Sequence, residues 1–353
     1  MFSRVKLTDR SFFSFVSILI PIRNEGNYIS QCLQAVSRQD YPSDRFEILI
    51  SDGLSTDNTK ALVAEWMKND HRIRLFDNPQ KIVPTGMNRL IPQAKGEVII
   101  RVDGHCVIAP DYVRNCVRHL QEDGVDGVGG PMHSIGEDLI SEVTALAMSS
   151  KFGVGNSSFR TESGVTKLAD TVPFPAYKRS IIEKVGLYDE ELVRNQDDEY
   201  NYRIREAGGK ILLAEDVKSE YYSRGSLLKL WKQYFQYGFW KVRVLQKHPR
   251  QMSLRQFVPL AFVLALVLTL FLSLLVPWGW KALLALVGAY FLTNLSASII
   301  IGSGQGINKL LLLPLAFAII HFSYGLGFLV GLFKFWNRWK DKVGKVPILC
   351  PKS

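Results

Sequence analysis

The C-terminal third of the chain almost lacks acidic residues. Between Glu220 and Asp341 there is no aspartate or glutamate, whereas thirteen lysine or arginine residues occur there. The net charge is +10 for the whole chain and +15 for residues 221–353, which leaves −5 for residues 1–220. A nucleic-acid-binding domain would carry its basic residues on the folded domain that faces the ligand. The charge split therefore excludes a nucleic-acid partner and favours a membrane surface beside the basic part.

Cysteine is scarce as well. The four cysteines, Cys32, Cys106, Cys116 and Cys350, form no CxxC pair and show no metal-binding spacing. No signal peptide is recognisable before them. We therefore expect reduced thiols in a cytosolic domain.

Three glycine-rich or aromatic motifs are also missing. The chain contains no GxGxxG, no GxxxxGK[ST] and no QxxRW. The first two absences exclude the usual dinucleotide fold and the P-loop fold. The third argues against a processive polymer synthase. A nucleotide, if one binds, must be held in another way, for example with a metal ion.

What the chain does have is a series of apolar runs that end in polar residues. The run at 98–102 is apolar apart from Arg101, reads as a buried strand and is followed by Asp103, Gly104 and His105. In open α/β sheets, ligands bind outside the carboxyl ends of the strands. Asp103 and His105 can thus reach one divalent cation there. The alternative is that Asp103 only opens a turn with Gly104.

Strands and helices alternate along the first hundred residues. We expect strands at 15–20, 46–51 and 72–76, and helices at about 27–38 and 84–93. A further helix, capped by Thr56 or Asp57, is expected to carry Leu62, Val63 and Trp66. This order predicts a parallel sheet with right-handed crossovers, and hence an α/β fold. Within residues 139–176, the glycine- and serine-rich piece at 153–158 and the run that starts at 171 and continues to 177 are expected to form loops over the cleft.

Four sequence blocks resemble the signature of the family 2 inverting glycosyltransferases. The blocks are SILIPIRNE at 17–25, SDGLSTDNT at 51–59, VDGH at 102–105 and NQDDEYNYR at 195–203. The resemblance covers roughly residues 15–250, and within the family it is most similar to membrane-attached transferases of succinoglycan-type exopolysaccharide synthesis. It implies a GT-A fold, which is Rossmann-like with a mostly parallel sheet.

The resemblance also implies roles in binding a UDP-sugar for the residues that match the motifs. Asp52 would accept the uracil imide N–H, and this is sensible chemistry for a carboxylate. Pro21, Arg23 and Glu25 would line the nucleoside, and Asp103 would lie at the diphosphate.

Family members use an Asp-x-Asp pair to hold Mg²⁺ or Mn²⁺ on the diphosphate, and here His105 stands at the second position. Because imidazole can bind Mn²⁺, Asp103 and His105 are the expected metal ligands. The alternative is a metal held by Asp103 alone.

The catalytic base implied by the fourth block is Asp197. Inverting transfer needs a base that takes the proton of the acceptor hydroxyl during attack opposite the leaving UDP. The alternative is that the acids at 197–199 only form a solvated helix start, with Glu199 paired to Arg203.

Residues 226–247 predict an aromatic and basic amphipathic helix, which is typical of a segment in a membrane interface. Its five basic side chains are expected to face an anionic leaflet: Lys229, Lys232, Lys241, Arg243 and Lys247. An ordinary packing helix of the enzyme is the alternative.

Three runs that follow, at 257–278, 282–301 and 310–333, are each long enough to span a bilayer. An odd number of spans places the basic tail opposite the catalytic domain, whereas basic flanks favour the cytoplasmic side. Either the tail lies outside, or one segment is re-entrant or interfacial.

The expected organisation is a cytosolic GT-A domain at 1–220, an interfacial helix region at 221–255, α-helical transmembrane segments at 256–335 and a basic tail at 336–353. The expected function is a metal-dependent, inverting hexosyltransferase of the bacterial inner membrane. It would move a glucose-like sugar from a UDP-sugar to a lipid-linked, polyprenyl-diphosphate saccharide. A polyprenyl-phosphate sugar synthase is one alternative, and a membrane scaffold or transporter with a degenerate nucleotide domain is another.

Overall fold

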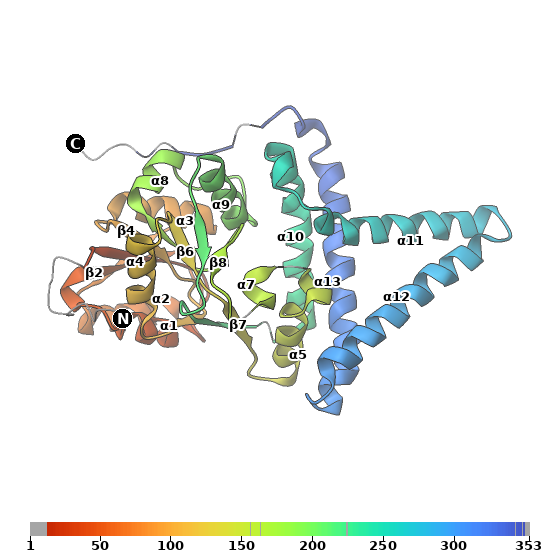
Figure 1. The fold of residues 1–353 in the computed structure, drawn as a ribbon, viewed down its shortest axis with the longest axis horizontal. Coiled ribbons are helices and arrows are strands. Elements are labelled where there is room, and N and C mark those ends of the chain that lie inside the picture. Colours follow the sequence, from red (N-terminus) through yellow and green to blue (C-terminus); the bar gives the residue numbers. More distant parts are fainter. Residues whose placement is uncertain are drawn as a thin grey trace, which may run out of the picture.

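The computed structural model describes residues 13–155, 157–162, 164–223, 225–342, 344–347 and 349. Cys350 and the first residues of the predicted N-terminal domain lie outside these ranges. The described part contains a sheet domain with helices on both faces, followed by four long helices on one side of it (Figure 1).

The first half of the main sheet is parallel, as predicted. Its strands run in the order β3-β2-β1-β4. Their bounds are β1 Val16–Ile22, β2 Phe46–Asp52, β3 Ile73–Asp77 and β4 Val98–Arg101. Every residue of β1, β2 and β4 is buried. Because the strands are parallel, their carboxyl ends meet at one edge of the sheet.

The second half of the main sheet is mixed. After β4 the order continues β9-β6-β10-β8, with β9 antiparallel to both of its neighbours and β10 parallel to β6. These strands are β6 Gly127–Gly129, β8 Lys167–Leu168, β9 Ala176–Lys178 and β10 Ile211–Leu213. A smaller sheet has the order β5-β11-β7, formed by β5 Cys106–Ile108, β7 Met132–Ile135 and β11 Ser219–Tyr222. The mostly parallel α/β fold expected from the sequence is confirmed.

The helices of the sheet domain pack on both of its faces. The core on one face contains Cys32, Val63 and Val113, from α1 (Ile29–Ser37), α2 (Thr59–Asn69) and α4 (Tyr112–Glu122). The core on the other face is filled by α3 (Val83–Leu90), α8 (Arg179–Val185) and α9 (Gln196–Glu206). Alternate residues of each buried strand point to opposite faces, which is why a continuous apolar run suits these strands.

The expectation of loops at 153–158 and 171–177 is wrong in part, because residues 153–154 and 158 lie in short helices and residues 176–177 lie in β9. Residues Leu139–Met148 form helix α5, and two short helices follow, α6 (Lys151–Val154) and α7 (Ser158–Thr161). The α5 helix starts at Asp138, whose side chain accepts a hydrogen bond from the backbone N–H of Ser141, while Ser141 bonds back to the Asp138 backbone. This reciprocal cap satisfies two N–H groups and sets the helix start.

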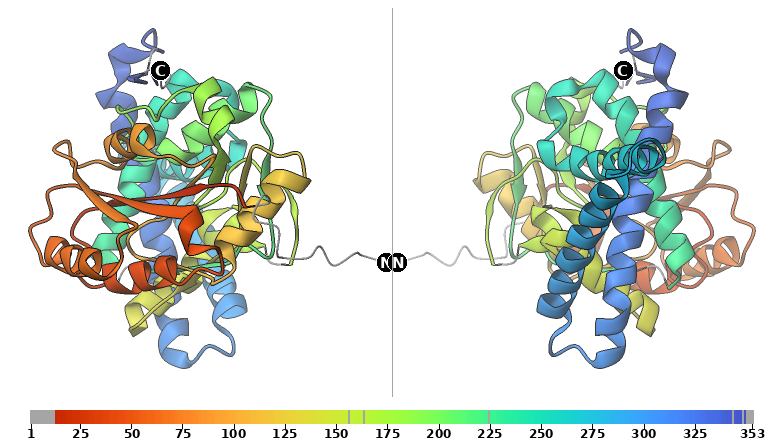
Figure 2. Two further views of the ribbon diagram at one scale, coloured as in Figure 1. Left: turned by 90° about the vertical axis from the view of Figure 1, so that its left-hand side faces the viewer. Right: turned by 90° about the vertical axis from the view of Figure 1, so that its right-hand side faces the viewer.

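The predicted amphipathic helix is α10 (Leu227–Lys247). It runs beside the long helix α13 (Ile307–Lys334), and both lie along the sheet domain (Figures 1 and 2). Helices α11 (Val258–Leu275) and α12 (Gly279–Gly302) project away from that pair. Among the described residues, three helical segments are long and apolar enough to cross a membrane: Leu254–Leu275, Gly279–Gly302 and Ile307–Lys334.

The expectation that five basic side chains of α10 face a membrane is wrong for three of them. Lys241 pairs with Asp198 of the sheet domain. Arg243 and Lys247 are buried and both bind Glu191, at 2.8 and 2.6 Å. Only Lys229 and Lys232 are exposed. The basic face of α10 therefore docks onto the acidic sheet domain.

Candidate active site

The candidate site is built around a buried arginine at the end of β4. Arg101 is 5% exposed, and its guanidinium donates to Oδ1 of Asp103 from Nε at 3.0 Å and from Nη2 at 2.8 Å. Its Nη1 contacts Oδ1 of Asp197 at the start of α9. One guanidinium thus joins the predicted metal ligand to the predicted base, although the two lie 94 residues apart in sequence.

The charge of Arg101 controls the ionisation of Asp103. Burial by itself would raise the pKa of this carboxyl group, but the guanidinium charge and its hydrogen bonds outweigh burial and hold the pKa below its usual value. Asp103 therefore stays ionised at neutral pH. An ionised carboxylate is the form that binds a divalent cation.

The three acids at the start of α9 point to three different partners. Asp197 faces Arg101, and its side chain remains 34% exposed. Asp198 pairs with Lys241 of α10. Glu199 is buried and pairs with Arg203 at 2.6 Å and with His248 at 3.1 Å. The predicted Glu199–Arg203 pair is thus present, but it does not involve Asp197.

The position of Asp197 follows from the backbone before it. Asn195 is the N-cap of α9 and adopts a left-handed φ of 62°, which asparagine tolerates better than most residues. Its side chain donates to the carbonyl of Tyr237 in α10 at 3.0 Å. The start of α9, and with it Asp197, is therefore held between β4 and α10.

His105 is fixed by Glu25. Its Nδ1 lies 2.9 Å from Oε1 of Glu25, and its ring packs edge-on against Tyr221 with centroids 4.9 Å apart. A metal-binding histidine usually has its other ring nitrogen bonded to a carboxylate. The Glu25 contact is of this kind and leaves Nε2 as the candidate ligand atom.

The described residues contain no group of three or more histidine, cysteine, aspartate or glutamate side chains that is suited to a metal ion. Magnesium in nucleotide enzymes is commonly held by one or two carboxylates plus substrate phosphates. An ionised Asp103 and a His105 oriented by Glu25 would supply two such side-chain ligands.

Two loops at the ends of β1 and β2 carry the predicted donor-binding residues. The backbone N–H of Glu25 donates to Thr59 Oγ1 at 2.8 Å, and the backbone N–H of Thr56 donates to Asn24 Oδ1 at 2.8 Å. Arg23 packs over Gly53, where a Cβ atom would lie 3.2 Å from the arginine side chain. Pro21 is in register with Ser51 on the neighbouring strand. The loops therefore form one unit.

Asp52 is fully buried at the floor of this unit. Its carboxylate accepts the backbone N–H of Ser55 at 3.0 Å and also the Ser55 hydroxyl, and Lys60 Nζ lies 3.9 Å away. An ionised carboxylate offers about four acceptor positions. Two remain available after the Ser55 contacts, which leaves capacity for an imide N–H.

The comparisons with known proteins decide the family. Residues 17–186 match the family model described as "Glycosyl transferase family 2". The chain is also 30% identical over 323 residues to "Succinoglycan biosynthesis protein ExoA" of Rhizobium meliloti, covering 91% of this chain and 96% of that protein.

This chain belongs to glycosyl transferase family 2.

Two further similarities agree with this assignment. A dolichyl N-acetyl-α-D-glucosaminyl phosphate 3-β-D-2,3-diacetamido-2,3-dideoxy-β-D-glucuronosyltransferase of Methanococcus voltae is 31% identical over 242 residues, covering 66% of this chain and 75% of that protein. Among solved structures, the mannosyltransferase PcManGT of Pyrobaculum calidifontis, in complex with GDP-Man and Mn²⁺, has a TM-score of 0.57 at 19% identity, covering 91% of this chain and 88% of that one. The second similarity supports the GT-A-like fold of this family 2 member.

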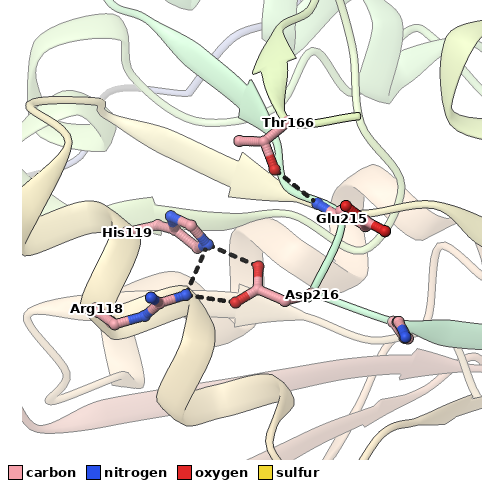
Figure 3. A pocket seen from close by; sticks show the side chains of 6 residues that line it. Arg118, His119, Thr166, Glu215 and Asp216 are labelled. Atoms are coloured by element: carbon pink, nitrogen blue, oxygen red, sulfur yellow. Dashed lines mark hydrogen bonds and ion pairs between the residues drawn. The ribbon is translucent and has the colours of Figure 1, made fainter. Parts of the chain in front are cut away.

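A surface pocket of about 350 Å³ lies away from the candidate site of this family 2 chain (Figure 3). His119 binds Asp216 there at 2.7 Å, and Arg118 contacts both side chains. None of the predicted donor, metal or base residues lines it. These ion pairs join α4 to the loop before β11, so we interpret the pocket as a structural junction.

Arg101 is the site residue that the sequence reasoning missed. A signal was present, because this residue is a charge at the end of an otherwise apolar strand. A buried guanidinium requires carboxylate partners. Asp103 was an obvious candidate for one partner, but the second, Asp197, comes from a distant segment and depends on the fold.

Proposed function

We propose that the chain is an inverting glycosyltransferase that moves one sugar from a UDP-sugar to a lipid-linked saccharide during polysaccharide synthesis at a membrane. The observation that carries this proposal is the contact of Arg101 with both Asp103 and Asp197. It brings the two carboxylates together at the edge of the sheet, which supports a role for Asp103 at the diphosphate and for Asp197 as the base.

The donor would lie over the two joined loops. Asp52 would accept the imide N–H of uracil, since its carboxylate has acceptor capacity left after Ser55. Pro21, Arg23 and Glu25 would border the nucleoside from the first loop. This arrangement is supported by the position of all four residues at the carboxyl ends of β1 and β2, where ligands bind in open α/β sheets.

The diphosphate would lie beside Asp103 and His105. A divalent ion, Mg²⁺ or Mn²⁺, held by these two side chains would neutralise the charge that develops on the leaving UDP. Arg101 keeps Asp103 ionised, and Glu25 orients His105. Both contacts prepare this pair before a donor binds.

Asp197 would act as the base. It would take the proton of the acceptor hydroxyl while the oxygen attacks the anomeric carbon on the side opposite UDP, which inverts the configuration. The side chains of Asp197 and Asp198 are 34% and 30% exposed, whereas Glu199 is buried, and Asp198 pairs with Lys241 of α10. We assign the base role to Asp197 because it is the partly exposed acid that shares Arg101 with Asp103.

A lipid-linked acceptor is supported by an apolar pocket between α5–α6 and α12. The pocket has a volume of about 440 Å³, and apart from two serines and Lys151 its lining is apolar: Leu146, Phe152, Ala297, Ile300 and Ile301. Lys151, which also lines this pocket, is exposed, and its positive charge would suit a lipid phosphate. The membrane helices therefore offer a path for a polyisoprenoid chain next to the sheet domain, which we place in the cytoplasm.

Product analysis tests this function. Membranes that contain the protein are incubated with labelled UDP-sugars, Mn²⁺ and one of three acceptors: a polyprenyl-diphosphate saccharide, a polyprenyl phosphate or the free saccharide. We expect transfer to the first acceptor with inversion at the anomeric carbon, as read by NMR. Transfer to the polyprenyl phosphate alone would assign a polyprenyl-phosphate sugar synthase instead. If no sugar is transferred from any nucleotide sugar, the proposal that the chain is a glycosyltransferase is refuted.

A further inference from the structure

The long helix α13 is attached to the sheet domain at both of its ends. Near its start, Lys309 binds Glu142 of α5 at 3.0 Å. Just after its end, Arg338 binds Glu191 at 2.5 Å. In its middle, His321 Nε2 lies 2.8 Å from the carbonyl oxygen of Phe152. Glu191 lies between α8 and α9 of the sheet domain. Glu142 and Phe152 lie in the segment between strands β7 and β8 of that domain, whose helix α5 packs against α10 and α13.

The tail after α13 continues along the same domain. The backbone N–H of Lys345 donates to Asp189 Oδ1 at 2.8 Å, and the backbone N–H of Glu190 donates to the Lys345 carbonyl at 2.9 Å. The buried amide of Gln246 in α10 donates to the carbonyl of Phe335 at 2.8 Å. The tail and the sheet domain are therefore on one side of any bilayer.

These contacts do not allow α13 to cross a membrane. At 1.5 Å per residue, the 25 steps from Lys309 to Lys334 cover about 38 Å, which exceeds the hydrocarbon thickness of about 30 Å. If α13 crossed, Glu142 and Glu191 of one folded domain would lie in water on opposite sides of the bilayer. A crossing by α13 is therefore incompatible with these two ion pairs.

The helices α11 and α12 behave differently. They form a hairpin that points away from the sheet domain, with residues 276–278 at its tip (Figure 1). Side chains such as Leu274, Phe291 and Ile300 are 77%, 60% and 76% exposed. Segments of 22 and 24 residues give helices of about 33 and 36 Å, each long enough to cross.

The residues at the tip and at the base of the hairpin suit the two faces of a bilayer. Trp278 and Trp280 at the tip are about half exposed, and exposed Lys281 follows them. Tryptophan and lysine are typical of a membrane–water boundary. The residues that precede α11 and follow α12 include basic Arg250, Arg255 and Lys309, and the end of α13 is followed by further basic residues.

We infer that the described part of the chain crosses the membrane twice, as the α11–α12 hairpin, and that α13 lies in the interface on the side of the sheet domain. The partner of the outer face of α13 is the headgroup region of that leaflet. Apolar residues face it, including Leu311 and Phe333, which are 68% and 74% exposed. This inference rests on the membrane attachment proposed above. With two crossings, the basic tail lies on the same side as the sheet domain, as the positive-inside tendency favours.

Cysteine labelling in sealed membranes tests this topology. The background is the full chain with Cys350→Ser, in which Cys32, Cys106 and Cys116 are buried. Single cysteines replace exposed residues in α2, at the hairpin tip and in the tail: Lys68→Cys, Lys281→Cys and Lys340→Cys. Each variant is treated with a membrane-impermeant maleimide in vesicles of both orientations.

We expect Lys68→Cys and Lys340→Cys to be labelled from the same side and Lys281→Cys only from the other. Labelling of Lys340→Cys together with Lys281→Cys would show three crossings and overturn the inference. Labelling of Lys281→Cys from the Lys68 side, or from neither side, would also overturn it. Sugar transfer is measured in the same vesicles, so a wrong topology with normal transfer is distinguished from a wrong function.

Discussion

Replacing Glu191 with glutamine should destabilise the junction between the sheet domain, α10 and the tail. Glu191 is 8% exposed at its side chain and receives Arg243 at 2.8 Å, Lys247 at 2.6 Å and Arg338 at 2.5 Å. A neutral amide cannot pair with three cations. The change leaves the buried guanidinium of Arg243 with a weaker partner and no counter-charge from this side chain.

The size of the effect follows from the pKa of Glu191. Burial alone would raise this pKa, but Arg243 and Lys247 lower it from 4.5 to about 2. One pKa unit corresponds to about 1.4 kcal/mol, so the ionised form contributes on the order of 3 kcal/mol to stability at neutral pH. Removing one partner of a buried ion pair costs a similar amount, about 3–5 kcal/mol.

The sign of the pH dependence is set by the lowered pKa. The contribution of Glu191 is complete above about pH 4.5, where the unfolded chain is ionised too, and it is lost as the pH falls towards 2. We expect the melting temperature of Glu191→Gln in detergent to be lower than that of the parent by roughly 4–7 °C at pH 7, because a chain of 353 residues has an unfolding entropy of about 0.7 kcal/mol/K. The difference should shrink below pH 4.

The control for Glu191→Gln is the same change at an exposed glutamate. Glu183→Gln changes an exposed glutamate of the nearby helix α8 in the same chemical way, and its melting temperature should stay within about 1–2 °C of the parent. If Glu191→Gln melts like Glu183→Gln at pH 7, the buried ion network does not hold the tail to the sheet domain. The reasoning would then be refuted.

Three further changes test the site. Chelation should abolish transfer and Mn²⁺ should restore it, with His105→Ala needing more Mn²⁺; an unchanged Mn²⁺ dependence would mean that His105 is not a ligand. Arg101→Gln should lower kcat by roughly 10–100-fold, because a charge-assisted hydrogen bond contributes about 1.5–3 kcal/mol, and Arg101→Lys should recover part of it; a normal kcat would contradict its positioning role. Asp52→Asn should weaken UDP binding in calorimetry by roughly tenfold or more, whereas unchanged binding would remove Asp52 from the nucleoside site.

Much of the sheet could be predicted because local chemistry decided it. The runs that became β1, β2 and β4 are apolar and end at polar loops, so their burial and the position of Asp103 followed from the residues alone. Helix α5 was missed because its cap at Asp138 was not recognised within a glycine- and serine-containing region.

The partners of charged residues could not be predicted in the same way. The spacing of Lys241, Arg243 and Lys247 on α10 is equally typical of a membrane-facing helix and of a helix docked on acidic residues. The choice depends on where Asp198 and Glu191 lie in three dimensions. Whether two or three of the apolar helices cross a membrane depends likewise on the contacts at both ends of α13. Sequence patterns do not contain those contacts.

The central claim is that Asp197 is the base of a sugar transfer, and turnover of Asp197→Asn tests it most directly. The rate is measured with saturating UDP-sugar and lipid-linked acceptor beside Asp170→Asn, a matched change at an aspartate that is 78% exposed at its side chain. We predict a loss of roughly 10²–10⁴-fold for Asp197→Asn with UDP affinity almost unchanged, and normal turnover for Asp170→Asn. Near-normal transfer by Asp197→Asn would contradict the account.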